Sequence, residues 1–254
     1  MMSDTPPDTA QSIDLNRLHW RDPLRWLRLG LRDFTHCPAV GLFYGGCFAA
    51  MGWALALVFQ SAPAYTLVLS AGFLLMGPFL CLGLYRASQI LERGGTPGFV
   101  DSLVAWRTRT GTLAIFGFVL LVLEMLWGRA ALVVFAVSFD GMPDFRGSLL
   151  ALLEPKNLGF IAAYLTVGGV FAGLIFAVSV VSMPLILDRP VDAISAGLAS
   201  LRLAFTQPAV MLLWGALITL LTVLAMLPWF GGLLVVGPVL GHASWHAYRA
   251  GVKA

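Results

Sequence analysis

The sequence is poor in charged residues. Only 11% of its 254 residues are Asp, Glu, Lys or Arg, while 59% are hydrophobic and the mean hydropathy is +0.85. A soluble domain carries about a quarter charged residues, so this composition excludes an ordinary soluble fold. The alternating pattern of membrane-spanning strands is also lacking, which argues against a transmembrane barrel. We therefore predict an all-α, polytopic bundle of transmembrane helices.

Metal-binding and catalytic residues are equally scarce. The three cysteines are odd in number and lie at or inside apolar runs, where free thiols are usually small packing residues (Cys37, Cys47 and Cys81). The sequence has no phosphate-binding loop, no HExxH, no GxSxG, and no pair of carboxylates on one face of an expected span. We predict no cofactor, no metal site and no enzymatic activity.

The chain has four histidines, and only His242 and His246 lie one helical turn apart. A haem-copper centre needs several histidines on different spans, and no further residue completes a ligand set around this pair. A metal role is therefore the less favoured alternative. The favoured interpretation places both at the cytoplasmic end of the last span, beside Trp245 and Tyr248, which we expect at the membrane interface.

A cleavable signal sequence is lacking at the start, because the first residues, MMSDTPPDTAQSID, are polar. We predict a disordered cytoplasmic segment over residues 1–13 and a single membrane domain over residues 14–254.

Long uncharged runs fill most of that domain. A span needs about 20 apolar residues, and six are expected, at residues 39–60, 64–87, 112–138, 158–187, 208–227 and 230–248. Lys and Arg accumulate on cytoplasmic flanks. Most of the 16 basic residues flank the spans on one side, and only Arg146 and Lys156 occupy the long loop on the other. Both termini are therefore predicted to be cytoplasmic.

Three stretches of the domain begin alike. Asp22 and Asp192 each open an expected amphipathic helix, since Asp caps the free amides of a helix start, and a proline that begins a span follows each (Pro38 and Pro208). A weaker, shorter copy begins at Asp101. We predict three related units, each an interfacial helix plus a helical hairpin, at residues 22–93, 98–189 and 190–250.

The expected interfacial helices combine an apolar stripe with arginines. The first has the stripe Leu24, Leu27, Leu31 and Phe34 beside Arg25, Arg28 and Arg32, and the last has Ile194, Leu198, Leu201 and Phe205 beside Arg202. Such helices lie in the interface with the apolar face down and the arginines on anionic headgroups. Membrane lipids are the predicted partners. Nucleic acid is not, because the net charge is only +3.

A proline interrupts the second span of each unit: Gly77 and Pro78, then Pro184, then Gly237 and Pro238. Proline removes an amide and frees the carbonyl four residues earlier, which a helical bundle tolerates when neighbours satisfy that carbonyl. We expect architectural kinks, with solute binding at the break as the alternative.

Glu124 is the clearest charge inside an expected span, in LVLEMLWGRAAL. Intramembrane ionisable groups are costly and mark function by default. The favoured interpretation is an ion pair with Arg129, five residues on, or with a partner subunit. Proton or ion handling, and a position near the periplasmic interface, are the alternatives.

Small residues recur every four positions in two spans: Gly41, Gly45 and Ala49, and Gly169, Gly173 and Ala177. Such spacing lets helix backbones approach closely. We expect both motifs to pack within the chain, with contact to a second copy as the alternative.

Four stretches resemble one family: DPLRWLRLGLRDF, AGFLLMGPFLCLGLYRASQILERG, VVSMPLILDRPVDAI and LLVVGPVLG. Through them residues 22–249 resemble the bacterial integral membrane family catalogued as domain of unknown function 2189. The resemblance implies several spans in the bacterial cytoplasmic membrane and no established activity. Some members carry a cytochrome c oxidase label, which the few histidines of this chain do not support as a catalytic role.

Two classes of function follow. The favoured one is a non-enzymatic structural, assembly or accessory protein of a membrane complex, with a respiratory complex or a second copy as candidate partners. The alternative is a transporter or channel for an apolar or amphipathic solute or lipid, which the repeats and the proline-broken spans favour.

Overall fold

The structure is a computed structural model that describes residues 13–61, 66–138 and 158–253. Its elements in chain order are α1 (Asp22–His36), α2 (Pro38–Ser61), α3 (Thr66–Glu92), α4 (Phe99–Leu103), the 3-10 helix η2 (Ala105–Arg109), α5 (Thr110–Ser138), α7 (Leu158–Ser179), α8 (Ser182–Asp188), α9 (Ala193–Thr206), α10 (Pro208–Met226) and α11 (Leu233–Gly251). The described residues form helices and one isolated bridge, and no strand, which confirms the all-α class. Residues 1–12 and the loop with Arg146 and Lys156 lie outside the described residues.

Four helical segments are long and apolar enough to cross a membrane: Pro38–Ser61, Ala105–Ser138, Leu158–Asp188 and Pro208–Met226. They confirm an integral membrane protein with several apolar helices. Helices also occupy the other two expected spans, as α3 and α11, but neither is among the four. The count of six spans therefore stays a prediction.

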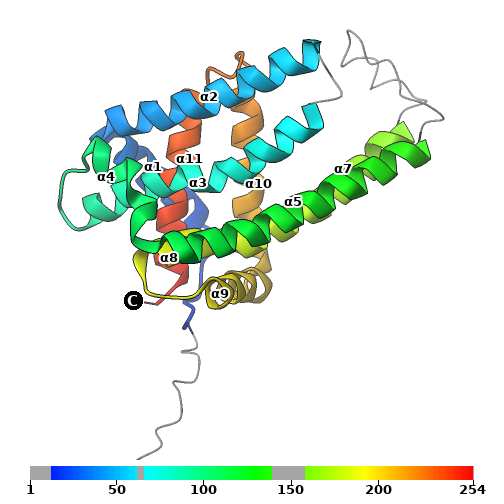
Figure 1. Cartoon of the computed structure of the whole chain (residues 1–254). Coiled ribbons are helices and arrows are strands. Elements are labelled where there is room, and N and C mark those ends of the chain that lie inside the picture. Colours follow the sequence, from blue (N-terminus) through cyan, green and yellow to red (C-terminus); the bar gives the residue numbers. More distant parts are fainter. Residues whose placement is uncertain (1–12, 62–65, 139–157, 254) are drawn as a thin grey trace, which may run out of the picture.

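Helix α11 is the centre of the fold. It packs against α1, α2, α3, α8 and α10, and with α10 it runs across the direction of α2 and α3 instead of alongside them (Figure 1). Glycines allow the close approach: a Cβ on Gly45 of α2 would overlap the carbonyl oxygen of Leu234, and one on Gly30 of α1 would overlap that of Val239. The first small-residue motif thus packs within the chain, as expected.

The second small-residue motif behaves differently. No described atom lies within 4 Å of a Cβ placed on Gly169 or Gly173 of α7, and both glycines are exposed. The expectation that these two glycines pack within the chain is wrong for its described part, because α7 meets α5 through another face, on which Trp127 contacts Gly168.

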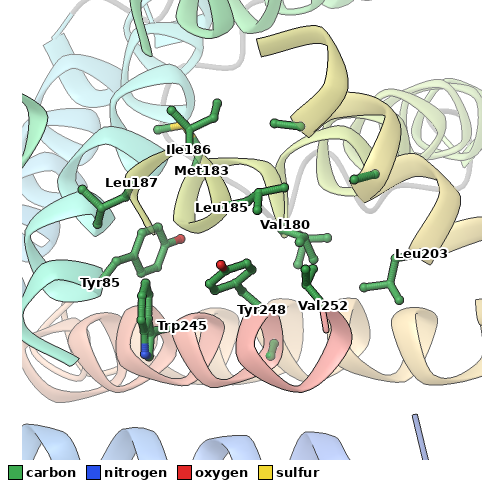
Figure 2. Packing of buried hydrophobic residues seen from close by; sticks show 14 of the residues in the cluster. Tyr85, Val180, Met183, Leu185, Ile186, Leu187, Leu203, Trp245, Tyr248 and Val252 are labelled. Atoms are coloured by element: carbon green, nitrogen blue, oxygen red, sulfur yellow. The ribbon is translucent and has the colours of Figure 1, made fainter. Parts of the chain in front are cut away.

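The main core lies between α8, α9, α3 and α11. Figure 2 shows Met183, Leu185 and Ile186 of α8 above Trp245 and Tyr248 of α11, and all five are at most 1% exposed. The expectation that Trp245 and Tyr248 belong to an interfacial aromatic belt is therefore wrong. Their rings fill the core, and their polar tips find partners inside the protein.

The expected span over residues 158–187 is not one continuous helix. Helix α7 ends at Ser179, a turn follows at Val180 and Val181, and α8 begins at Ser182. Pro184 therefore lies in the first turn of a new, fully buried helix, where its missing amide leaves no intrahelical bond unmade. The prediction of a kink inside a span at Pro184 is corrected to a helix break.

The helix starts agree with the sequence in part. The side chain of Asp192 caps α9 by accepting hydrogen bonds from the amides of Ile194 and Ser195, both at 2.9 Å. A hydrogen bond from the Ser195 side chain, together with these two amide bonds, holds the pKa of Asp192 below its ordinary value. Asp22 is instead the first residue of α1 and accepts from the amide of His19 at 2.7 Å, so its predicted capping role is wrong.

Asp101 likewise does not start its helix. It lies inside α4, and its side chain accepts a hydrogen bond from the amide of Gly98 at 3.1 Å. This short helix begins at Phe99 and gives way to η2 after five residues. The third copy of the interfacial helix is thus much shorter than the other two.

The two long amphipathic helices turn their apolar stripes outward. Helix α1 buries Trp26, Gly30 and Asp33 against its neighbours, whereas Leu24 and Leu31 are exposed. Helix α9 does the same, because it buries mostly small residues while Ile194, Leu198 and Phe205 of its stripe are 60–75% exposed. Each helix also buries one large apolar residue, Trp26 in α1 and Leu203 in α9, but several large apolar residues of both stripes face the surroundings of the protein.

The two ends of the described chain lie together. The amide of Asn16 donates to the carbonyl of Gly251 at 2.9 Å, and that of Lys253 donates to the carbonyl of Asp14 at 3.0 Å. Both ends therefore lie on the same side of the molecule.

Candidate functional site

A polar network is buried where α1, α3, α8 and α11 meet. Its first pair joins α1 to α11: His246 Nε2 lies 2.8 Å from Oδ2 of Asp33, which is only 2% exposed. Burial alone would raise the pKa of Asp33, but the hydrogen bond and charge of His246, with a hydrogen bond from Ser88, outweigh burial and hold this pKa below its ordinary value. Asp33 is thus a carboxylate with a fixed partner.

The second histidine, His242, is fully buried. Its Nδ1 lies 2.8 Å from the hydroxyl oxygen of Ser88 on α3, and its Nε2 lies 4.0 Å from the sulfur of Cys37. A serine and a histidine at this distance resemble a nucleophile and its base. Both, however, have no exposed surface, so a substrate has no route to the hydroxyl.

The Cys37 thiol is no better placed for chemistry. It donates to the carbonyl of Asp33 at 3.2 Å, and burial, together with the charge of Asp33, raises the pKa of Cys37 to about 11. A thiol that stays protonated is a poor nucleophile and metal ligand. Among the described residues, no group of three or more His, Cys, Asp or Glu is arranged to hold a metal.

Glu92, at the end of α3, holds the last turns of α11. Its two oxygens accept hydrogen bonds at 3.0 Å from the indole of Trp245 and from Nε of Arg249. Burial disfavours the arginine charge, but Glu92 and Asp188 outweigh it and raise the pKa of Arg249 above its ordinary value.

Asp188, at the end of α8, completes the network. Its oxygens accept from the hydroxyl of Tyr248 at 2.6 Å and from the amide of Gln89 at 2.7 Å, and guanidinium nitrogens of Arg93 and Arg249 lie 3.6 and 3.7 Å away. The carboxylates at this junction therefore each have cationic or hydrogen-bonding partners. The arrangement fixes four helices together and exposes no free acid or base.

The sequence placed both histidines on the last helix, where His242 lies in the middle of α11 and His246 one turn nearer its end, but it did not indicate Asp33, Ser88, Glu92 or Asp188. One signal was available: Asp33 is an acidic residue beside the arginines of α1, on the face of Trp26 and Gly30, seven and three residues earlier. The other three meet only through tertiary packing, which no local pattern indicates.

The proline break in α11 is closed by packing. The carbonyl freed by Pro238 belongs to Leu234, and this oxygen lies against the backbone of Gly45 in α2. Gly237 contacts the ring of Phe48, and Pro238 is buried. Among the described residues, the break in α11 is therefore packed against α2.

The corresponding break in α3 is less enclosed. Pro78 is half-buried, and no described atom lies within 4 Å of a Cβ placed on Gly77. The two Gly-Pro pairs therefore have the same sequence but differ in how closely neighbouring residues pack against them.

Glu124 on α5 stands apart from the network. It is 5% exposed, and its Oε2 has no hydrogen-bond partner. The expected ion pair with Arg129 is not formed, because five residues turn the two side chains about 140° apart around the helix, and Arg129 points to the exposed side. A cavity of about 300 Å³ adjoins the carboxylate, lined by Glu124, Trp127, Gly168, Phe171, Ala172, Ile175, Phe176 and Ser179.

The predicted headgroup residues are all on the surface: Arg25, Arg28, Arg32 and Arg202 are exposed. One guanidinium nitrogen of Arg32 lies 3.8 Å from Asp33, but the Arg32 side chain remains 61% exposed. The four arginines are therefore free to contact the surroundings of the protein.

Comparison with known proteins agrees with the resemblance found in the sequence. The family described as "Predicted integral membrane protein (DUF2189)" matches residues 66–188, so this part of the chain is similar to that family. The match runs from the start of α3 to the end of α8, and so includes the Glu124 cavity and both carboxylates Glu92 and Asp188. No curated protein and no solved structure matches the chain.

Proposed function

We propose that this protein is a non-enzymatic structural or accessory component of a bacterial cytoplasmic membrane, with both termini on the cytoplasmic side. The observation that carries the proposal is the setting of α1 and α9. Each buries one face on the protein and leaves large apolar side chains of its stripe and its arginines exposed. That combination fits a helix that rests among lipid headgroups.

The proposed organisation is six spans in three related units. Its best support is the junction before the first and fifth spans. Cys37, before Pro38, has φ −134° and ψ 60°, and Gln207, before Pro208, has φ −133° and ψ 55°. The same backbone turn thus joins an amphipathic helix to an apolar one at both places.

Lipid retention tests the lipid-facing role. The protein is purified in nanodiscs that contain anionic phosphatidylglycerol, and bound lipids are counted by native mass spectrometry. We expect an Arg25→Gln, Arg28→Gln and Arg32→Gln triple variant to lose most of the retained anionic lipid. The same three positions changed to Lys keep the charge and should retain it. Equal lipid retention in all three proteins would refute the role.

An accessory role also implies a partner, which a pull-down in mild detergent would identify. We expect one membrane protein, or a second copy of this chain, to be recovered reproducibly. Recovery of the chain alone as a monomer, combined with solute flux in proteoliposomes, would contradict this role.

The alternative function is a transporter for an amphipathic solute or lipid, and the Glu124 cavity favours it. A buried carboxylate without a partner inside a transmembrane segment is typical of a substrate or ion site. Loss of flux in a Glu124→Gln variant reconstituted in proteoliposomes would support transport.

Membrane orientation has a separate test. A reporter active only in the periplasm, fused after Ala254, should be silent because the described C-terminal end lies beside the N-terminal segment on the proposed cytoplasmic side. Reporter activity would reverse the proposed orientation.

A further inference from the structure

The cavity beside Glu124 contains a carboxylate oxygen that has no hydrogen-bond partner among the described residues. The other polar groups on its lining side chains are the indole N–H of Trp127 and the hydroxyl of Ser179, which donates to the carbonyl of Ile175 at 2.7 Å. The remaining lining residues are apolar or aromatic. A buried carboxylate in such surroundings loses its hydration without compensation unless a positive charge or a donor reaches it.

The aromatic side chains narrow the class of ligand. Trp127 and Phe171 have ring centroids 5.9 Å apart, and Phe176, five residues further along α7, also lines the cavity. Ring faces attract organic cations. A hard metal ion would need several more oxygen ligands, which these walls do not offer.

The position of the cavity fixes the route of entry. It lies between α5 and α7, and neighbouring apolar residues on both helices are exposed, Met125 at 57% and Leu174 at 40%. A ligand that arrives from the bilayer has to be lipophilic as well as charged. A volume of about 300 Å³ is at the lower end of the range for small-molecule sites.

We propose that this cavity binds a lipophilic organic cation, with its positive charge at the Glu124 carboxylate and its apolar body against Trp127, Phe171 and Phe176. The site does not depend on the lipid-facing arginines of α1 and α9. Its failure and that of the accessory role are therefore distinguishable, since lipid retention measures only the latter.

Binding of tritiated tetraphenylphosphonium to the full-length protein in zwitterionic nanodiscs tests the site, with empty nanodiscs as the background. We expect one saturable site and an affinity at least tenfold lower for Glu124→Gln, which keeps the shape and removes the charge. The matched control is Asp14→Asn, which removes an exposed carboxylate and should bind as the wild type does. Tetraphenylmethane, with the same shape and no charge, should not compete.

A second variant protects the conclusion against misfolding of the first. Ala172→Leu fills the cavity without altering any charge, and we expect a similar loss of affinity. The proposal is overturned if the wild type shows no saturable binding or if Glu124→Gln binds equally well. It is also overturned if Glu124→Gln instead separates the chain from a protein partner, because the carboxylate would then be a partner contact.

Discussion

Helix α11 and the α5–α7 pair hold ionisable residues in opposite settings. Along α11, His242, His246 and Arg249 lie within reach of serine, aspartate or glutamate partners supplied by α1, α3 and α8. On α5, the Glu124 Oε2 atom has no hydrogen-bond partner among the described residues, although the side chain is almost as deeply buried. Both regions are helical, so the difference comes from their neighbours.

The contrast between the α11 network and Glu124 distinguishes polar groups that stabilise the fold from a polar group that can bind a ligand. Polar groups that satisfy one another fix a fold, as at the junction of α1 and α11, whereas a buried group that the fold leaves unsatisfied is available to something outside it. The α11 network therefore stabilises the fold, and the α5–α7 cavity is the candidate binding site. Five predictions test this division.

The largest effect is expected where α2 meets α11. Gly45→Ala places a methyl group on the carbonyl of Leu234, a backbone atom that cannot move aside, and should destabilise the protein by about 3 kcal/mol or prevent folding. Thermal unfolding in detergent measures this. The neighbouring Gly46→Ala has nothing within 4 Å and should be neutral or gain about 0.5 kcal/mol. Equal behaviour of the two variants would contradict the packing.

The next effect concerns the buried pair of α1 and α11. Asp33→Asn keeps the shape but removes the charge beside His246, and should cost about 2 kcal/mol at neutral pH. A double-mutant cycle with His246→Gln isolates the pair, and the exposed Asp14→Asn should change stability by less than about 0.5 kcal/mol.

Acidification should weaken the pair of Asp33 and His246, and the direction of this change follows from the pKa of Asp33. The pKa of Asp33 is lower in the folded protein than its ordinary value of 3.8, so its stabilising contribution is complete above that value and is lost as the pH falls through the folded pKa. The stability gap between wild type and Asp33→Asn should therefore close on acidification below about pH 4. A gap that persists at low pH would exclude an ionised Asp33 as its source.

The same residues show which features of the structure could be predicted from the sequence. Helix positions follow from the apolar runs and from proline, so five of the six expected spans coincide with one helix each, the remaining one with α7 and α8, and Pro38 and Pro208 begin α2 and α10 as predicted. The apolar stripe of α1 could be predicted for the same reason, since its period is local.

The contacts that each helix makes with other helices could not be predicted from local sequence patterns. In a membrane protein the large apolar face does not identify the core, because lipid is as apolar as leucine. The buried face of α1 combines Trp26 with Gly30 and the charged Asp33, while the equally apolar Leu24 and Leu31 are exposed. The contact of Glu92 with Arg249, and the lack of one between Glu124 and Arg129, are set by residues distant in sequence.

Substitution of Glu124 and of Glu92 should change the free energy of unfolding by smaller amounts and in opposite directions. Glu124→Gln removes an unpaired charge from an apolar setting and should raise the free energy of unfolding by about 1 kcal/mol. Glu92→Gln weakens its bonds to Trp245 and Arg249 at a partly exposed site and should lower it by about 0.5 kcal/mol. Unfolding of both variants beside the wild type decides the signs. A loss of stability in Glu124→Gln would mean that the carboxylate already has a structural partner.

The smallest effect is expected on the exposed face of α7. Gly169→Ala and Gly173→Ala add methyl groups with no described atom within 4 Å, so each should change the stability by no more than about 0.5 kcal/mol, in contrast to Gly45→Ala on α2. The spacing of small residues is the same in both helices, and only the neighbours differ. Light scattering after size exclusion should also give the same mass for these variants as for the wild type. A lower mass would show that these glycines form a contact between two copies of the protein. The exposed face of α7 would then be an oligomer interface.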